Sequence, residues 1–279
     1  MADAALSQGH SDITLVPMLG YEPQADEVDS LVQLAFDQKL VSAATPAGAR
    51  LDMHLAFGNL DAPSAYRLLG DAASEAGAAR RTMEWTSTRF SPDHVVEFSA
   101  IRPNRGRISV FGRLGVPEEA ARLENFVAGH WGCSNLFYGV HPRSDSLLTS
   151  TSAAAGSQVA STHTVFFDHD DGPADAAGRL EWERRIVALH SADRIDAAVR
   201  SGNGLHIYID VVEERDPQAL KQRQGLLKNW IGLVGADPSA NDLARILRLP
   251  YTINIPNQSK LKKGRRLGLA TVITDPRHV

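Results

Sequence analysis

The sequence predicts a mixed α/β (α+β) fold, for three reasons. From about Trp85 onward, short β-like runs alternate with helical segments, a pattern typical of layered domains that combine sheets and helices. A hydrophobic content of 43% and a charged content of 22% are ordinary for a globular protein, so the chain can bury a sizeable core. Its 279 residues suffice for one large domain with a smaller accessory part. We expect a helical accessory region over residues 1–85 and an α/β domain over residues 86–279.

Helical signals dominate the first 85 residues. Apolar side chains at helical spacing form one stripe, which consists of Val28, Leu31, Val32, Ala35 and Phe36. A second helix is predicted across Ser64–Ala79. We assign these helices a packing role and no chemistry.

Turn residues and periodicity place the elements of the α/β domain. Residues 95–101 and 107–111 are predicted to form a β-hairpin, because proline and glycine mark the turn between them. A helix is predicted over Glu118–Ala128, with a proline at its start. The Ser/Thr/Ala/Gly-rich stretch Ser144–Ser161 is expected to be a mobile surface loop. The remaining predicted elements are the strands Asn135–Val140, Thr164–Asp168 and Leu205–Val211 and the helices Ala177–Leu189 and Pro217–Val234.

Composition excludes several classes of protein. The single cysteine, Cys133, rules out an internal disulfide framework and a thiolate zinc cluster. No apolar run approaches the roughly 20 residues that a bilayer span needs. The N-terminus has no basic region followed by an apolar stretch, the mark of a secretory signal. We therefore expect a cytoplasmic protein without a membrane partner.

The net charge of −4 hides an uneven distribution of charge. Residues 1–62 carry nine acidic and two basic side chains, whereas residues 241–266 carry seven basic ones and only Asp242. Residues 89–113 add five arginines against two acidic residues. Because phosphate binding depends on local positive potential, this distribution permits a polyanionic partner. A basic run is also compatible with a plain solvated surface.

A first candidate motif is V-F-F-D-H-D-D, residues 165–171, in which an apolar β-like run ends in acidic residues. Side chains at i and i+2 of an extended chain share a face, so Asp168 and Asp170 are expected to point the same way. Two neighbouring carboxylates repel unless a cation lies between them, and Mg²⁺ prefers oxygen ligands. The alternative is a solvated acidic turn before Gly172.

A second candidate motif is S-G-N-G-L-H-I-Y-I, residues 201–209, in which a glycine turn leads into a strand. Alternation buries the aliphatic residues and puts His206 on the opposite face. Glycines let backbone N–H groups approach a phosphate, and an imidazole can donate a hydrogen bond to it. The alternative is a hairpin with an exposed histidine. A rolling-circle nickase is disfavoured, since its motif needs a second histidine where Tyr208 stands.

A third candidate motif covers residues 235–254, G-A-D-P-S-A-N-D-L-A-R-I-L-R-L-P-Y-T-I-N. Arg245 and Arg248 are three residues apart, so on a helix they would share a face and could grip a triphosphate. Asp237 before a proline can simply be the N-cap of a helix.

Together, the three motifs resemble the archaeo-eukaryotic primase superfamily, especially its prophage and plasmid primase-polymerases. That family has an acidic D-x-D or D-x-E after a strand, then a Ser/Gly-rich turn leading to a histidine, then an aspartate followed by basic residues. The phage branch commonly reads R-x-L-R-L-P-G-T-x-N in the third motif, and N-L-F-Y-G-V-H-P-R at residues 135–143 is similar to the segment before its first motif. The resemblance covers roughly residues 90–266. Tyr251 departs from it, because a glycine usually stands there, and this leaves sugar discrimination open.

The resemblance implies roles for individual residues. Asp168, Asp170 and Asp237 would bind Mg²⁺ or Mn²⁺, with Asp242 as the rival for the third place. His206 would act beside them in catalysis. The incoming nucleotide would be held by Ser201, Gly202, Gly204, His206, Arg245, Arg248 and Asn254, with Arg143 as a further candidate for phosphate or template contact.

The resemblance also implies a fold, a reaction and partners. The fold would be a catalytic core with an RNA-recognition-motif-like sheet, joined to a second α/β unit. The reaction would be template-directed nucleotidyl transfer by two metal ions on single-stranded DNA, with nucleoside triphosphates as substrates and a separate helicase as a further partner. The basic segment Lys260–Arg266 and the arginines of residues 102–113 would track the template. The alternatives are a non-catalytic replication initiator with a primase-like core and a metal-dependent nuclease.

Overall fold

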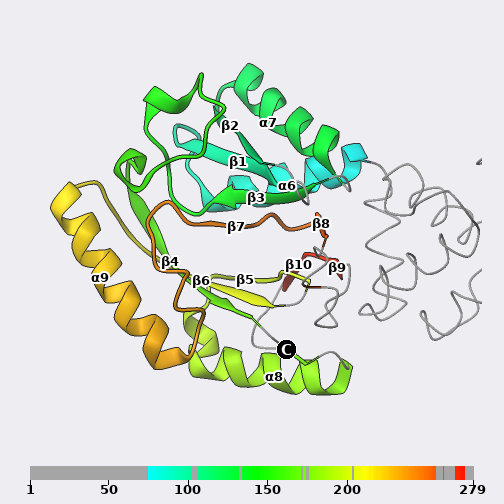
Figure 1. The fold of residues 1–279 in the computed structure, drawn as a ribbon, viewed down its shortest axis with the longest axis vertical. Helices are drawn as coiled ribbons and strands as arrows, with labels where there is room; N and C mark the ends of the chain where they lie inside the picture. The colour runs from blue at the N-terminus through cyan, green and yellow to red at the C-terminus, as the bar shows by residue number, and fades with distance from the viewer. Residues whose placement is uncertain are drawn as a thin grey trace, which may run out of the picture.

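The computed structural model describes residues 75–101, 106–131, 134–170, 172–173, 176–202, 204–255, 260 and 268–273 (Figure 1). The predicted stripe at residues 28–36 and most of the predicted helix Ser64–Ala79 lie outside these ranges. The first described element is helix α6 (Glu75–Arg89), which runs across the expected boundary at residue 85.

Four α-helices and two four-stranded antiparallel sheets make up the described part of the chain, as the predicted α/β (α+β) fold requires. The first sheet has the order β2-β1-β3-β7, with β1 at Val95–Ile101, β2 at Arg107–Arg113, β3 at Asn135–Gly139 and β7 at Ile246–Arg248. The second has the order β10-β5-β6-β4, with β4 at Thr162–His169, β5 at Ala197–Arg200, β6 at Leu205–Glu214 and β10 at Thr271–Ile273. A small pair consists of β8 (Ile253–Asn254) and β9 (Gly268–Leu269). The other helices are α7 (Pro117–His130), α8 (Ala176–Leu189) and α9 (Pro217–Val234).

The two sheets share one hydrophobic core. Phe98 and Tyr138 from the first sheet and Phe166 and Tyr208 from the second belong to the same cluster of buried side chains, and each is at most 1% exposed. The rings of Tyr138 and Tyr208 lie 6.4 Å apart. Helix α7 covers the first sheet, whereas α8 and α9 border the second (Figure 1). The shared core fixes the two sheets relative to each other, which matters because both contribute to the site described below.

Helix starts follow the sequence signals. Helix α7 begins at its proline, as predicted, and acidic residues occupy its first turn, where they favour the helix dipole. Helix α9 begins after Asp216, whose carboxylate accepts hydrogen bonds from the backbone N–H groups of Gln218 and Ala219. It ends at Val234 and is capped by Gly235, which has a left-handed φ of 65°. That turn redirects the chain toward the end of β4.

The Ser144–Ser161 stretch is more closely packed than a mobile surface loop, which corrects the expectation for it. Leu147 and Ala154 are buried against Val95 and Phe111 in a second small core. Two short 3₁₀ turns and a β-bridge to Val159 organise the backbone. Two widely spaced apolar residues in a Ser/Ala-rich background are enough to attach the stretch to the first sheet.

Candidate active site

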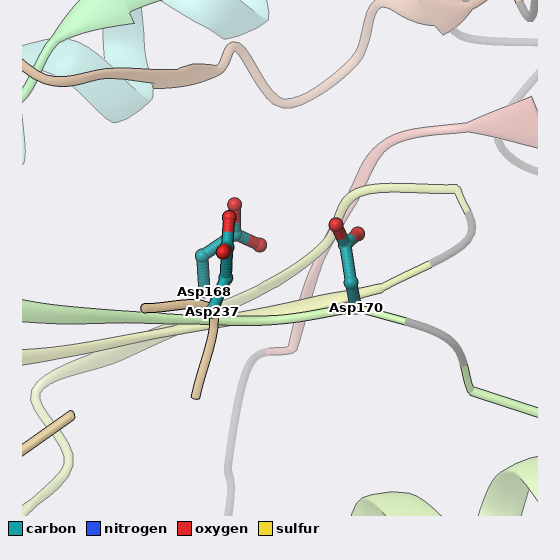
Figure 2. A group of neighbouring side chains, drawn as sticks. All are labelled: Asp168, Asp170 and Asp237. Atoms are coloured by element: carbon teal, nitrogen blue, oxygen red, sulfur yellow. The ribbon is translucent and has the colours of Figure 1, made fainter. Parts of the chain in front are cut away.

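Three carboxylates from separate parts of the sequence converge at the end of β4. Asp168 is the penultimate residue of that strand, Asp170 directly follows the strand, and Asp237 comes just after α9. One oxygen of each lies within 4.8 Å of one oxygen of each of the others, and the side chains rise from the same side of the chain (Figure 2). The backbone N–H of Asp237 donates to the carbonyl of Asp168 over 2.7 Å, so the turn after α9 is fixed to β4. In the described residues no other group of three potential ligands meets this distance criterion.

The electrostatics of Asp168 fit a divalent cation. Burial and the neighbouring Asp237 carboxylate raise its pKa to about 6, and the opposing charges of Arg245, Arg248 and Lys260 only partly offset this. Its Oδ1 is buried without a hydrogen-bond partner; the Nε2 of His206 lies 3.4 Å away, at ion-pair rather than hydrogen-bond geometry. A buried, orphaned carboxylate oxygen in an all-carboxylate set suits a hard cation such as Mg²⁺ or Mn²⁺.

The metal-free protein is expected to become more stable when Asp168 is replaced by asparagine. A carboxyl group whose pKa is higher in the folded state than in the unfolded chain favours folding below about pH 4 and opposes it increasingly up to about pH 6. Asp168→Asn should therefore raise the free energy of unfolding by about 1–3 kcal/mol at pH 7.5 and much less at pH 4. Urea unfolding in EDTA at both pH values measures this. Asp242→Asn, outside the cluster, is the control, and an equal gain from it would contradict the explanation.

The glycine turn of residues 201–204 packs directly against the end of β4. Gly202 has a φ of 96°, which favours glycine. A Cβ on Gly204 would lie 2.5 Å from the carbonyl oxygen of His169 and 3.2 Å from a carboxylate oxygen of Asp170, so a larger residue does not fit there. The N–H of Gly204 donates to the hydroxyl of Ser201 over 3.2 Å. The predicted turn therefore lies beside the carboxylates.

His206 lies opposite Asp168 in the pairing of β4 with β6. It is only 4% exposed, so the alternative of an exposed histidine is wrong; both faces of this part of β6 are covered. Burial, followed by the charge of Arg248, lowers the pKa of its imidazole to about 3. The ring is therefore neutral at physiological pH.

Arg248 comes from the other sheet and completes the site. Its side chain donates to the carbonyl of Ile253 over 3.3 Å and to the Oδ1 of Asn254 over 3.0 Å. Asn254 in turn donates to the carbonyl of Ser201 over 2.9 Å. Burial lowers the pKa of Arg248 to about 9, against the opposing effect of Asp168 and Asp170. Arg248, Asn254 and the glycine turn thus form one connected network beside the carboxylates.

Neither of the two helices considered for the third motif is present among the described residues. Arg245 and Arg248 do not lie on a helix: residues 246–248 are strand β7, which pairs with β3. Both charges nonetheless lower the pKa of Asp168, so both lie near it. Asp237 does not cap a helix, because its carboxylate accepts the N–H and the hydroxyl of Ser239 in a tight turn, over 2.9 and 2.7 Å.

The rival third carboxylate lies elsewhere. Asp242 is half-exposed and pairs with Arg245 across 3.3 Å, and it does not belong to the cluster. The geometry therefore brings Asp237, and not Asp242, to Asp168 and Asp170.

Arg143 is not part of this site, which corrects its prediction as a phosphate or template contact. Its side chain is fully buried, and its Nε donates to the carboxylate of Glu97 over 2.9 Å. Its Nη2 donates to the carbonyl of Ala244 over 3.0 Å. These contacts leave the guanidinium no open face for a phosphate.

The departure at Tyr251 has a structural counterpart. Its φ is 63°, a left-handed conformation that favours the glycine usual in the phage branch. The backbone is held by a 2.7 Å hydrogen bond to the carbonyl of Ala270. Its ring packs under the guanidinium of Arg81 on α6, 4.2 Å from the ring centroid. The tyrosine ring is therefore used in packing against α6.

Comparisons with known proteins give matches among solved structures alone. No protein-family model matches the chain, and no curated protein is similar enough in sequence to be matched.

Within the described ranges, no helix combines the length and apolar character that crossing a membrane requires.

Three similar solved structures are primases or a primase-polymerase. The cyanophage S-2L primase-polymerase AEP domain is 17% identical with a TM-score of 0.45, over 71% of this chain and 95% of that one. A crystal structure of primase RepB′ is 10% identical with a TM-score of 0.43, over 72% and 57%. The catalytic domain of primase RepB′ in complex with initiator DNA is 9% identical with a TM-score of 0.41, over 72% and 84%. These structures, to which the chain is similar at low identity, are archaeo-eukaryotic-type primases.

Proposed function

We propose that this protein is a nucleotidyltransferase that joins nucleotides on a single-stranded DNA template, in primer synthesis, DNA polymerisation or both. One observation carries the proposal: three carboxylates from distant parts of the sequence lie within 4.8 Å of one another, beside a network of Arg248, Asn254 and the glycine turn. The carboxylates suit cations, and the network suits the phosphates of a nucleotide that the same cations would contact.

In this proposal Asp168, Asp170 and Asp237 hold two Mg²⁺ or Mn²⁺ ions. When bound, such a pair of ions would lower the pKa of the attacking 3′-hydroxyl and stabilise the departing pyrophosphate. The protein fold positions the carboxylates: Asp168 lies on β4, Asp170 directly follows that strand, and the backbone of Asp237 is hydrogen-bonded to it.

The phosphates of the incoming nucleotide would lie between the glycine turn and Arg248. Arg248 and Arg245 offset charge on the phosphoryl oxygens, and the neutral imidazole of His206 donates a hydrogen bond to one of them. Because Arg248 is already held by Ile253 and Asn254, little side-chain entropy is lost when a phosphate binds. The glycine turn would bring its backbone N–H groups close to the same phosphoryl oxygens, at Ser201, Gly202 and Gly204.

The template contacts proposed from the sequence need revision. Arg107 pairs with Glu97, and Arg113 pairs with Glu119, so these arginines are occupied by acidic partners. Lys260 is close enough to lower the pKa of Asp168, which supports a place for it at the nucleotide phosphates. Arg102 and Arg105 lie outside the described residues, so they and the basic residues of 261–266 stay the proposed template contacts. A helicase stays a proposed separate partner.

The test is nucleotide incorporation on a primed or unprimed single-stranded template with Mg²⁺ or Mn²⁺. The double variant Asp168→Ala, Asp170→Ala should lose at least about 10³-fold in rate, because loss of even one electrostatic contact can cost about 10²–10³-fold. Circular dichroism and thermal unfolding check that the variant is folded.

The rivals give different results in the same assay. A non-catalytic initiator would bind single-stranded DNA without incorporating labelled nucleotide. A nuclease would degrade the template when metal is present and nucleotides are absent. Extension by the double variant at the wild-type rate would reject the proposed site.

A further inference from the structure

Tyr208 lies directly behind His206 in the interior of the second sheet. The two residues alternate along β6, so their side chains share a face, and the hydroxyl of Tyr208 lies 3.4 Å from the Nδ1 of His206. Tyr208 itself is fully buried at 0% exposure. A residue so enclosed is out of reach of solvent and of DNA. The hydroxyl must instead find its partners inside the protein.

The imidazole of His206 bridges this hydroxyl and the carboxylate cluster. Its second nitrogen, Nε2, lies 3.4 Å from the Oδ1 of Asp168. A neutral imidazole has one N–H and one lone pair, and the bond made by one nitrogen decides which nitrogen carries the proton. A lone pair on Nε2 would face a carboxylate oxygen and be repelled by it, whereas an N–H there would be attracted.

A second buried tyrosine packs beside the first. The ring centroid of Tyr138 on β3, which is 1% exposed, lies 6.4 Å from that of Tyr208. Burial raises the pKa of both phenols, so each keeps its proton and can donate. The protonated phenol of Tyr208 can therefore donate to the Nδ1 of His206, which lies 3.4 Å from its oxygen.

We infer that Tyr208 is a positioning residue: its hydroxyl donates to the Nδ1 of His206 and so keeps the Nε2–H directed at the carboxylate cluster. This assignment of the His206 tautomer holds whether or not the protein transfers nucleotides. The consequence for a nucleotide rests on the proposed function, in which that Nε2–H donates to a phosphate. Tyr208 then sets the tautomer that binds the nucleotide without touching it.

The first experiment measures the tautomer in the metal-free protein. Long-range ¹H–¹⁵N correlation spectra of protein labelled with ¹⁵N-histidine distinguish Nε2–H from Nδ1–H, and the variant His206→Gln identifies the signal. In the wild type we expect His206 in the Nε2–H form. In Tyr208→Phe we expect a mixture of tautomers, while the matched control Tyr138→Phe, which keeps the donor, should retain the Nε2–H form.

The second experiment measures its effect on nucleotide use. Loss of one positioned hydrogen bond in Tyr208→Phe should raise the KM for nucleotide by about tenfold, with a smaller change in kcat. Tyr138→Phe should change KM by less than about threefold. A purely structural role would instead lower the amount of folded protein and leave the KM of that fraction unchanged.

The outcomes separate this inference from the proposed function. The inference is overturned if His206 carries its proton on Nδ1 in the wild type, and this result does not need the variant to fold. It is also overturned if the Tyr208→Phe spectrum matches that of the wild type. Both results hold whether or not the protein is an enzyme. The expected spectra together with no nucleotide incorporation would leave the tautomer assignment standing and reject the proposed function. An unchanged KM in an active Tyr208→Phe variant would reject the role in nucleotide binding.

Discussion

Asp237→Asn is expected to lower nucleotide incorporation by about 10²–10³-fold, whereas Asp242→Asn should leave it within about fivefold of the wild type. The reason is geometric. Asp237 shares the cluster with Asp168 and Asp170. In the proposed function its loss would remove one of three metal ligands and weaken metal binding by the other two. Asp242→Asn removes only a half-exposed ion pair with Arg245, and such pairs contribute little to stability. Initial rates at saturating template and a series of metal concentrations measure both variants.

The metal series makes the comparison sharper than a single rate. Asp237→Asn should need a higher concentration of Mg²⁺ or Mn²⁺ for half-maximal rate, by about 10–100-fold, and Asp242→Asn should not. If Asp242→Asn were as damaging as Asp237→Asn, with the same shift in metal dependence, then the third carboxylate would have been assigned to the wrong residue.

Local signals in the sequence were sufficient for much of the fold. Most elements were predicted close to their observed bounds, namely the strands β1, β3, β4 and β6 and the helices α7 to α9. The signals that predict them are local: alternation, helical periodicity, prolines at helix starts and glycines at turns all involve neighbouring residues. The shared face of Asp168 and Asp170 follows from the same local rule.

Features that depend on distant partners could not be predicted in this way. Strand β7 is three residues long and exists because it pairs with β3, about 110 residues earlier. From the sequence alone, Arg248 within it and Arg245 just before it looked equally suited to a helix. The place of Asp237 depends on a hydrogen bond to Asp168 across the fold. Arg143 stands in a segment that is similar to the one before the first acidic motif of phage primases. Only its ion pair with Glu97, 46 residues away, shows why it is buried.

Glu97→Ala is expected to be the most destabilising substitution considered for this protein, at about 3–5 kcal/mol of unfolding free energy. The carboxylate is 0% exposed and lies between two arginines, Arg143 and Arg107. It also accepts hydrogen bonds from the hydroxyl of Ser109 over 2.9 Å and the N–H of Ala154 over 3.3 Å. Removing it leaves the guanidinium of Arg143 buried without its counter-charge. Urea unfolding at pH 7.5 measures the loss.

The acid dependence of this loss follows from the pKa of Glu97. Burial acts to raise that pKa, but Arg143, Arg107 and the hydrogen bonds outweigh it, so the pKa in the folded state lies below 4.5. The stabilisation is therefore complete above the unfolded-state pKa of about 4.5 and disappears as the pH falls through the lower folded-state value. The difference between wild type and Glu97→Ala should accordingly shrink in acid.

Two variants separate an uncompensated charge from simple loss of contacts at this position. Glu97→Met with Arg143→Met removes both charges, and replacing a buried pair by apolar residues is often far less costly than breaking it, so the double variant should be more stable than Glu97→Ala. Glu119→Ala breaks the more exposed pair with Arg113 and should cost less than about 1 kcal/mol. Arg143 also donates to the carbonyl of Ala244, the residue just before Arg245. If the double variant recovers stability but not nucleotide binding, the buried pair also positions Arg245. A cost for Glu97→Ala no larger than that for Glu119→Ala would mean that water reaches Arg143, and the burial on which this prediction rests would be wrong.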